Sequence, residues 1–147
     1  MNRSQETSLS FTLNELEMIA NNLYLLKDRY KVYTFSGPLG AGKTTMVKEL
    51  IKQFGVTTAI VSPTFSYVNV YENTQGQLLY HFDLYRLAHL QEFLEAGFDE
   101  FLYLNKSWTF IEWPEIITPL LTHQVCTITI DYNPINHEQR DISYLTL

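Results

Sequence analysis

Residues 37–44 read Gly-Pro-Leu-Gly-Ala-Gly-Lys-Thr, and this stretch determines how the rest of the chain is interpreted. Its glycines let the backbone turn its N–H groups toward one point, because no Cβ blocks the turn or the ligand. Lys43 can reach the β- and γ-phosphates of a nucleotide, and the Thr44 hydroxyl can bind Mg²⁺. The stretch therefore predicts a phosphate-binding loop.

The sequence on either side of this loop has the pattern of an entering strand and a departing helix. Residues 31–36 are β-prone, and apolar residues after the loop recur at helical spacing up to Phe54, where Gly55 provides a C-terminal cap. Average residue usage gives about a 0.5% chance of the loop pattern in a chain of this length. The flanks make a chance glycine turn less plausible still, so nucleotide binding is predicted.

The expected base is adenine. Guanine-specific proteins of this class normally carry an Asn-Lys-x-Asp element, and the nearest match, at residues 105–108, has Trp108 where the carboxylate should be. ATP is therefore expected in preference to GTP.

Two acidic residues, Asp83 and Glu112, end apolar strand-like runs and could hold Mg²⁺ and its waters, although either could instead cap a helix or lie on the surface. His81 is interpreted as a hydrogen-bonded structural residue, because no second histidine is near it. Trp113 and Tyr85 could stack on a base or a partner, or could simply close the core.

Hydrophobic periodicity and turn residues predict the other elements. A capping box at residues 12–15 begins a helix that reaches about Asp28, and residues 66–71 and 78–84 form a hairpin. Further elements are expected as short helices at 87–104, broken at Gly97, and strands at 108–111, 125–132 and 141–147. The predicted fold class is α/β: a P-loop NTPase-like three-layer sandwich in which a mixed sheet has a parallel core and antiparallel hairpins. One domain, residues 1–147, is expected.

Composition limits the function classes. The 147 residues are 46% apolar, which is enough for one core, and no run is long enough to span a membrane. A soluble, cytoplasmic protein is expected, with no membrane partner. Cys126 is the only cysteine, so no intramolecular disulfide can form. The net charge of −6 argues against direct binding of DNA or RNA through phosphate neutralisation.

Four motifs follow one another along the chain: Gly-Pro-Leu-Gly-Ala-Gly-Lys-Thr-Thr (37–45), Ser-Pro-Thr-Phe (62–65), His-Phe-Asp-Leu-Tyr-Arg (81–86) and Ile-Glu-Trp-Pro-Glu (111–115). Together they resemble the bacterial TsaE family, also called YjeE, over nearly the whole chain. The resemblance implies a Mg²⁺-dependent ATPase required for threonylcarbamoyladenosine modification of tRNA. It also implies action on the TsaB–TsaD complex, with tRNA reached only through that complex.

The resemblance implies roles for individual positions. Lys43 would contact the β- and γ-phosphates, while Thr44 and Glu112 would hold Mg²⁺. Thr64 would sense the γ-phosphate, and Asp83 would position the attacking water or the waters of Mg²⁺. The nucleotide-binding residues would be Gly37, Pro38, Leu39, Gly40, Ala41, Gly42, Lys43, Thr44, Thr45, Trp113 and Arg140. The chain departs from the family at Pro38, where an acidic residue is common, and in its short tail after Arg140.

Turnover is expected to be slow without a partner, because none of the four arginines is an evident arginine finger. A small-molecule P-loop kinase is an alternative, but no segment has the two neighbouring arginines that a kinase lid commonly uses. A nucleotide-gated binding module without useful hydrolysis is a second alternative.

Overall fold

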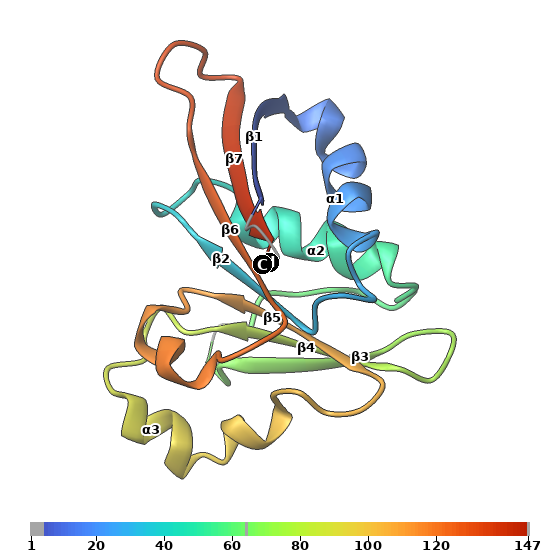
Figure 1. Cartoon of the computed structure of the whole chain (residues 1–147), viewed down its shortest axis with the longest axis vertical. Coiled ribbons are helices and arrows are strands. Elements are labelled where there is room, and N and C mark those ends of the chain that lie inside the picture. The colour runs from blue at the N-terminus through green and yellow to red at the C-terminus, as the bar shows by residue number, and fades with distance from the viewer. Residues whose placement is uncertain (1–4, 64, 147) are drawn as a thin grey trace.

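A mixed sheet runs through the molecule, with helices on either side (Figure 1). The computed structural model describes residues 5–63 and 65–146. These residues form seven strands in the spatial order β1-β7-β6-β2-β5-β4-β3. The strands are β1 (Gln5–Thr12), β2 (Val32–Ser36), β3 (Val68–Glu72), β4 (Leu78–Asp83), β5 (Ser107–Glu112), β6 (Val125–Tyr132) and β7 (Gln139–Thr146).

The four central strands, β6, β2, β5 and β4, run parallel to one another. Antiparallel pairs complete the sheet on both sides: β3 with β4, β7 with β6, and β1 with β7. A central parallel strand is covered on both faces, so most of its side chains are buried. All six residues of β5 are buried, including its terminal Glu112. The predicted parallel core with antiparallel hairpins is confirmed.

Two helices cover one face of the sheet. α1 (Leu16–Tyr24) follows the 3-10 turn η1 (Leu13–Glu15), and α2 (Lys43–Gln53) lies beside it (Figure 1). Both helices send apolar side chains into the larger core cluster, among them Leu23 from α1 and Met46 from α2. This packing fixes the N-terminal end of α2 against the sheet.

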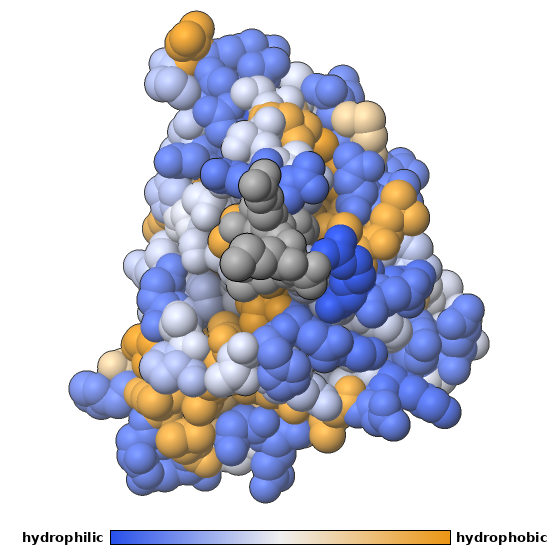
Figure 2. Space-filling view, in the orientation of Figure 1, coloured by the Kyte–Doolittle hydropathy of each residue, from blue (hydrophilic) through white to orange (hydrophobic). Residues whose placement is uncertain are grey.

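Shorter helices cover part of the opposite face: α3 (Leu90–Glu95), η2 (Phe98–Phe101) and η3 (Glu115–Leu120). They pack on a second apolar cluster that includes Phe82 and Phe93. Figure 2 shows hydrophobic side chains gathered over α3 and η3, at the lower left. Helices on both faces of the sheet give the three layers that the sequence predicted.

Several local predictions are confirmed. The Thr12 N–H donates to Glu15 Oε1 at 3.0 Å, as in a capping box. Gly97 separates α3 from η2 with a φ of 75°, and the Gly55 N–H caps α2 by donating to the Lys52 carbonyl at 2.9 Å. No helix among residues 5–63 and 65–146 is long and apolar enough to cross a membrane.

Two parts of the fold differ from expectation. α1 ends at Tyr24 because residues 25–29 form tighter turns, such as the one closed by the Lys27 N–H donating to the Tyr24 carbonyl at 3.0 Å. β1 was not predicted. Only Phe11 in this strand is buried, so its sequence carries almost no apolar alternation.

Candidate functional site

The glycine-rich loop connects the end of β2 to the start of α2. Gly37 packs so closely on β6 that a Cβ on it would lie 1.9 Å from the Ile130 carbonyl oxygen. Gly42 is the residue before α2 and has a φ of 103°, a left-handed conformation that other residues rarely adopt. The loop is therefore shaped by contact with the sheet as well as by its own turns. It leaves the positive N-terminal end of α2 open to an anion.

Lys43 is buried beneath this loop, with 4% of its surface exposed. Its Nζ donates to the carbonyl oxygens of Gly37 at 2.6 Å and Pro38 at 2.9 Å. The same Nζ lies 3.9 Å from the centroid of the Trp113 ring. Burial lowers the pKa of Lys43 below its ordinary value, and the carboxylates of Glu112 and Asp83 act in the opposite direction. The ammonium group is thus held against the backbone carbonyls at the start of the loop.

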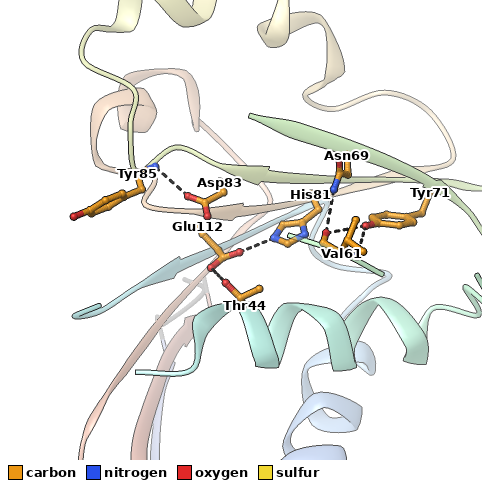
Figure 3. Close-up of polar contacts among 8 residues, drawn as sticks. All are labelled: Thr44, Val61, Asn69, Tyr71, His81, Asp83, Tyr85 and Glu112. Carbon is orange, nitrogen blue, oxygen red and sulfur yellow. Dashed lines mark hydrogen bonds and ion pairs between the residues drawn. The ribbon is translucent and has the colours of Figure 1, made fainter. Parts of the chain in front are cut away.

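Glu112 joins three elements at one carboxyl group (Figure 3). Thr44, on α2, donates from Oγ1 to Glu112 Oε1 at 2.6 Å. His81, on β4, lies with Nε2 2.6 Å from Glu112 Oε2. His81 and Glu112 are 0% and 1% exposed. The interpretation of His81 as a hydrogen-bonded residue is confirmed, and its partner is a residue of the candidate site.

Asp83 ends β4 directly beside Glu112, because the two residues are register partners on neighbouring parallel strands. Burial raises the pKa of Asp83 above its ordinary value; the Tyr85 N–H, which donates to Oδ1 at 3.1 Å, acts in the opposite direction. The Tyr85 ring lies 4.9 Å from the Trp113 ring, centroid to centroid. These aromatic rings border the acidic end of the site.

A cavity of about 280 Å³ brings most of the predicted residues together. Its lining comes from the loop, the start of α2 and the ends of β4 and β5: Leu39, Gly40, Gly42, Lys43, Thr44, Thr45, Asp83, Tyr85, Glu112 and Trp113. A helix terminus, an ammonium, a hydroxyl and two carboxyl groups thus face one space. This combination suits a phosphate chain with a hard, oxygen-binding cation.

A second cavity, also of about 280 Å³, lies on the other side of the loop and shares Gly40, Gly42 and Thr45 with the first. Its remaining lining residues are Phe11, Leu13, Leu16, Ala41, His137, Glu138 and Arg140. This cavity is apolar toward α1 and polar toward the β6–β7 hairpin. The loop therefore separates two neighbouring spaces of different character.

Arg140 lines the second cavity and not the first, which Lys43 and Thr44 line. Its guanidinium lies 4.7 Å from the Tyr132 ring centroid, and its NH1 donates to the carbonyls of His137 and Gln139, both at 3.0 Å. The Tyr132 hydroxyl in turn donates to the Leu39 carbonyl of the loop at 2.7 Å. Sequence reasoning missed Tyr132, which ends an alternating strand and carries no local signal.

Thr64 lies outside the described residues, so its predicted role stays a prediction. The chain just before it is anchored at Val61 (Figure 3). The Tyr71 hydroxyl donates to the Val61 carbonyl and accepts from the Val61 N–H, both at 3.0 Å, and Asn69 Nδ2 donates to the same carbonyl at 3.0 Å. Both partners belong to β3.

Known proteins resemble this chain in sequence and in fold. The family model described as "Threonylcarbamoyl adenosine biosynthesis protein TsaE" matches residues 11–142. The tRNA threonylcarbamoyladenosine biosynthesis protein TsaE of Rickettsia felis is 38% identical over 132 residues, which cover 89% of this chain and 70% of that protein. The protein of the same name from Treponema pallidum is 39% identical over 106 residues, 71% of this chain and 76% of that protein.

The crystal structure of Bacillus subtilis YdiB has the same fold, with a TM-score of 0.72 at 24% identity, over 99% of this chain and 88% of that one. The family match covers the loop, both strand-end carboxyl groups, β6 and the first part of β7. This chain belongs to the TsaE family.

Proposed function

We propose that this protein binds ATP with Mg²⁺, hydrolyses it slowly, and serves the threonylcarbamoyladenosine modification of tRNA. The observation that carries the proposal is the single cavity in which the loop, Lys43, Thr44, Asp83 and Glu112 meet. The family name of the relatives supports the pathway. The ammonium, hydroxyl and carboxyl groups that line the cavity support the binding of a nucleotide with Mg²⁺.

Binding of the phosphates follows from the loop and α2. The N-terminal end of α2 attracts negative charge, and the loop N–H groups can donate to phosphate oxygens. Lys43 already donates to two carbonyls, so its ammonium is placed to exchange these acceptors for phosphate oxygens. The loop residues from Gly37 to Thr45 are accordingly proposed as the phosphate-binding set, with Trp113 beside them.

The residues present fit Mg²⁺ by their chemistry. Thr44 and Glu112 offer a hydroxyl and a carboxylate, and Asp83 offers a second carboxylate nearby. Among the described residues there is no group of three or more His, Cys, Asp or Glu that could hold a metal ion. Mg²⁺ commonly uses one or two protein oxygens together with substrate phosphates, which matches this donor set. Mg²⁺ would neutralise charge on the phosphates.

Hydrolysis requires an oriented water, and Asp83 is the proposed group. Its partly buried carboxyl group lies beside Glu112 in the cavity and can accept a hydrogen bond from water. Thr64 is proposed to sense the γ-phosphate on the basis of sequence alone. The conformation of the segment that follows Val61 would then differ between the ATP and ADP forms, while the contacts of Tyr71 hold Val61 in place.

The adenosine end of ATP is proposed to occupy the second cavity, because that cavity adjoins the first through Gly40, Gly42 and Thr45. Phe11 and Leu13 give it an apolar wall, and Arg140 lies at its polar side. Arg140 would then contact the nucleotide away from the phosphates.

A partner is proposed to complete the catalytic site. No arginine of the described residues lines the first cavity, where Lys43 and Thr44 lie. Arg29, Arg86 and Arg140 lie instead over the rings of Tyr30, Phe65 and Tyr132. A cation supplied in trans accelerates hydrolysis in many P-loop proteins. The TsaB–TsaD complex is the proposed partner, with tRNA reached only through it.

The test is ATP hydrolysis by the protein alone and with its TsaB and TsaD counterparts, with Lys43→Ala as the control. We expect slow hydrolysis alone, faster hydrolysis with the partners, and none in the control. Turnover of about 10 per second by the isolated protein, typical of a self-sufficient enzyme, would contradict dependence on a partner. A phosphorylated metabolite in place of free phosphate would identify a kinase.

A further inference from the structure

His81 is fully buried, and its Nε2 lies 2.6 Å from Glu112 Oε2. The other carboxylate oxygen of Glu112 accepts from Thr44 Oγ1 at the same distance. His81 and Asp83 alternate with Phe82 along β4, so both side chains project toward the face that carries α2. The imidazole therefore contacts one carboxylate oxygen of Glu112 while the Thr44 hydroxyl contacts the other.

The surroundings of His81 Nδ1 indicate which ring nitrogen of His81 carries the proton. His81 Nδ1 is buried and has no hydrogen-bond partner among the described residues. A proton on Nδ1 would be a buried donor without an acceptor, which is costly, whereas a bare Nδ1 is tolerated more easily. The neutral ring protonated at Nε2 satisfies the contact, since Nε2–H donates to Glu112 Oε2. Glu112 is then a carboxylate that accepts one hydrogen bond on each oxygen.

We propose that His81 is a positioning residue that holds the Glu112 carboxylate so that Oε1 faces the Thr44 hydroxyl, the group expected to bind Mg²⁺. The inference rests on the proposed function, because it assigns a task within the same site. A buried histidine that donates to a carboxylate fixes both groups, as outer-shell residues do around metal ligands. When Thr44 turns its hydroxyl lone pairs to a metal, His81 remains to orient Glu112.

A role limited to packing predicts something different. If His81 only filled space, an apolar residue of similar size would serve as well, and Mg²⁺ dependence would not change. If it positions Glu112, any residue that donates a hydrogen bond from the place of Nε2 should serve. Glutamine provides such a donor, because its side-chain amide reaches about as far as Nε2, whereas leucine provides none.

The experiment compares His81→Leu, His81→Gln and the wild type by the fluorescence of mant-ADP, a fluorescent ADP analogue. Two quantities are measured. The first is the affinity for mant-ADP in EDTA, and the second is the Mg²⁺ concentration that gives half of the fluorescence change seen when Mg²⁺ is added to the mant-ADP complex. We expect His81→Leu to raise this Mg²⁺ concentration about tenfold or more, as outer-shell substitutions do. His81→Gln should stay within about threefold, and affinity in EDTA should be unchanged in both.

The matched control is His123→Leu, because His123 is exposed and lies just before β6, at the end of the parallel strands away from the loop. It should leave both quantities unchanged. Two results would overturn the positioning role alone. One is a folded His81→Leu variant with the half-saturating Mg²⁺ concentration of the wild type; the other is a rise in that concentration as large in His81→Gln as in His81→Leu. A wild type with the same affinity in Mg²⁺ and in EDTA would contradict the proposed function and this inference together.

A measurement on the wild type keeps the inference testable even if His81→Leu does not fold. Long-range ¹H–¹⁵N spectra distinguish the tautomers of the four histidines, and the His81 signals are identified by their loss in His81→Gln. We expect Nε2 to be protonated and Nδ1 bare. A bare Nε2 could not donate to Glu112 and would overturn the proposal.

Discussion

Glu112 shows how single residues build this site, because α2, β4 and β5 all meet at its carboxyl group. A buried carboxylate without partners costs several kcal/mol, so Thr44 and His81 are needed for stability as well as for orientation. The sequence identified Glu112 and Asp83 from their positions at strand ends. It did not identify the contact of His81 with Glu112, because the pairing depends on how neighbouring strands align.

Asp83→Asn should change how stability depends on pH. The folded-state pKa of Asp83 is raised, so the group favours folding while it is protonated, and this contribution is lost as pH rises through the folded pKa. Asparagine does not ionise and can still accept from the Tyr85 N–H. We therefore expect the melting temperature of the variant, relative to wild type, to increase from about pH 4 to pH 7. A relative decrease over that range would mean that the pKa is lowered in the folded protein.

Glu112→Gln should separate binding from hydrolysis. Glutamine keeps the size of the side chain and can still accept a hydrogen bond from His81, but it removes the negative charge expected near Mg²⁺. We expect mant-ADP affinity in EDTA to stay within about threefold, while ATP hydrolysis with partners falls about 100-fold or more, as for loss of one electrostatic group in a catalytic site. Hydrolysis is followed by release of labelled phosphate.

The same variant tests the alternative of a nucleotide-gated binding module. If Glu112→Gln abolished hydrolysis yet supported tRNA modification as well as the wild type, turnover would not be needed for function. Loss of both together would support the proposed ATPase. Lys43→Ala, which should fail to bind nucleotide, provides the reference for complete loss.

Among the elements, the glycine loop is held by β6 as well as by β2 and α2. Gly37 packs on the Ile130 carbonyl, and the Tyr132 hydroxyl donates to the Leu39 carbonyl. Arg140, the register partner of Tyr132 on β7, lies over the tyrosine ring. The β6–β7 hairpin is therefore a support for the loop, although its sequence contains no phosphate-binding motif.

Tyr132→Phe should weaken nucleotide binding without unfolding the protein. The change removes only the hydroxyl that donates to Leu39, a half-exposed hydrogen bond worth about 0.5 to 1 kcal/mol. If loop geometry depends on this bond, mant-ADP affinity in Mg²⁺ should fall about two- to fivefold. Circular dichroism should remain that of the wild type.

The control for this variant is Tyr103→Phe, which removes a hydroxyl that accepts from the His123 N–H, at the opposite end of the parallel strands. It should leave affinity unchanged. If mant-ADP affinity fell equally in both variants, or did not fall in Tyr132→Phe, β6 would not control the loop through this contact.

The existence of β4, β5 and α2 and their places along the chain could be predicted from the sequence, because buried strands and the helix after the loop have strong apolar patterns. β1 could not, since seven of its eight residues are not fully buried and the strand is defined by pairing with β7. The position of Arg140 could not be predicted either. Its contact with Tyr132 depends on hairpin register, which a linear sequence does not specify.

At the scale of the whole molecule, the candidate site lies where the parallel strands β4 and β5 end and α2 begins. The segment nearest to a guanine-recognition element, at residues 105–108, lies at the other end of β5. A six-residue strand is about 20 Å long, so this segment cannot reach a base bound beside the loop. The position of this segment therefore agrees with the sequence-based prediction that it does not recognise a guanine base, and ATP rather than GTP stays the predicted nucleotide.

Thermal unfolding should therefore distinguish the nucleotides. A ligand that binds only the folded protein, at 100 times its dissociation constant, adds about 2.7 kcal/mol, which raises the melting temperature by about 5 to 10 °C for a domain of this size. We expect Mg-ATP to produce such a rise and Mg-GTP at equal concentration to produce a clearly smaller one. Lys43→Ala should show neither. A rise with GTP equal to that with ATP would contradict adenine preference, and equal rises in Lys43→Ala would place the binding outside the loop.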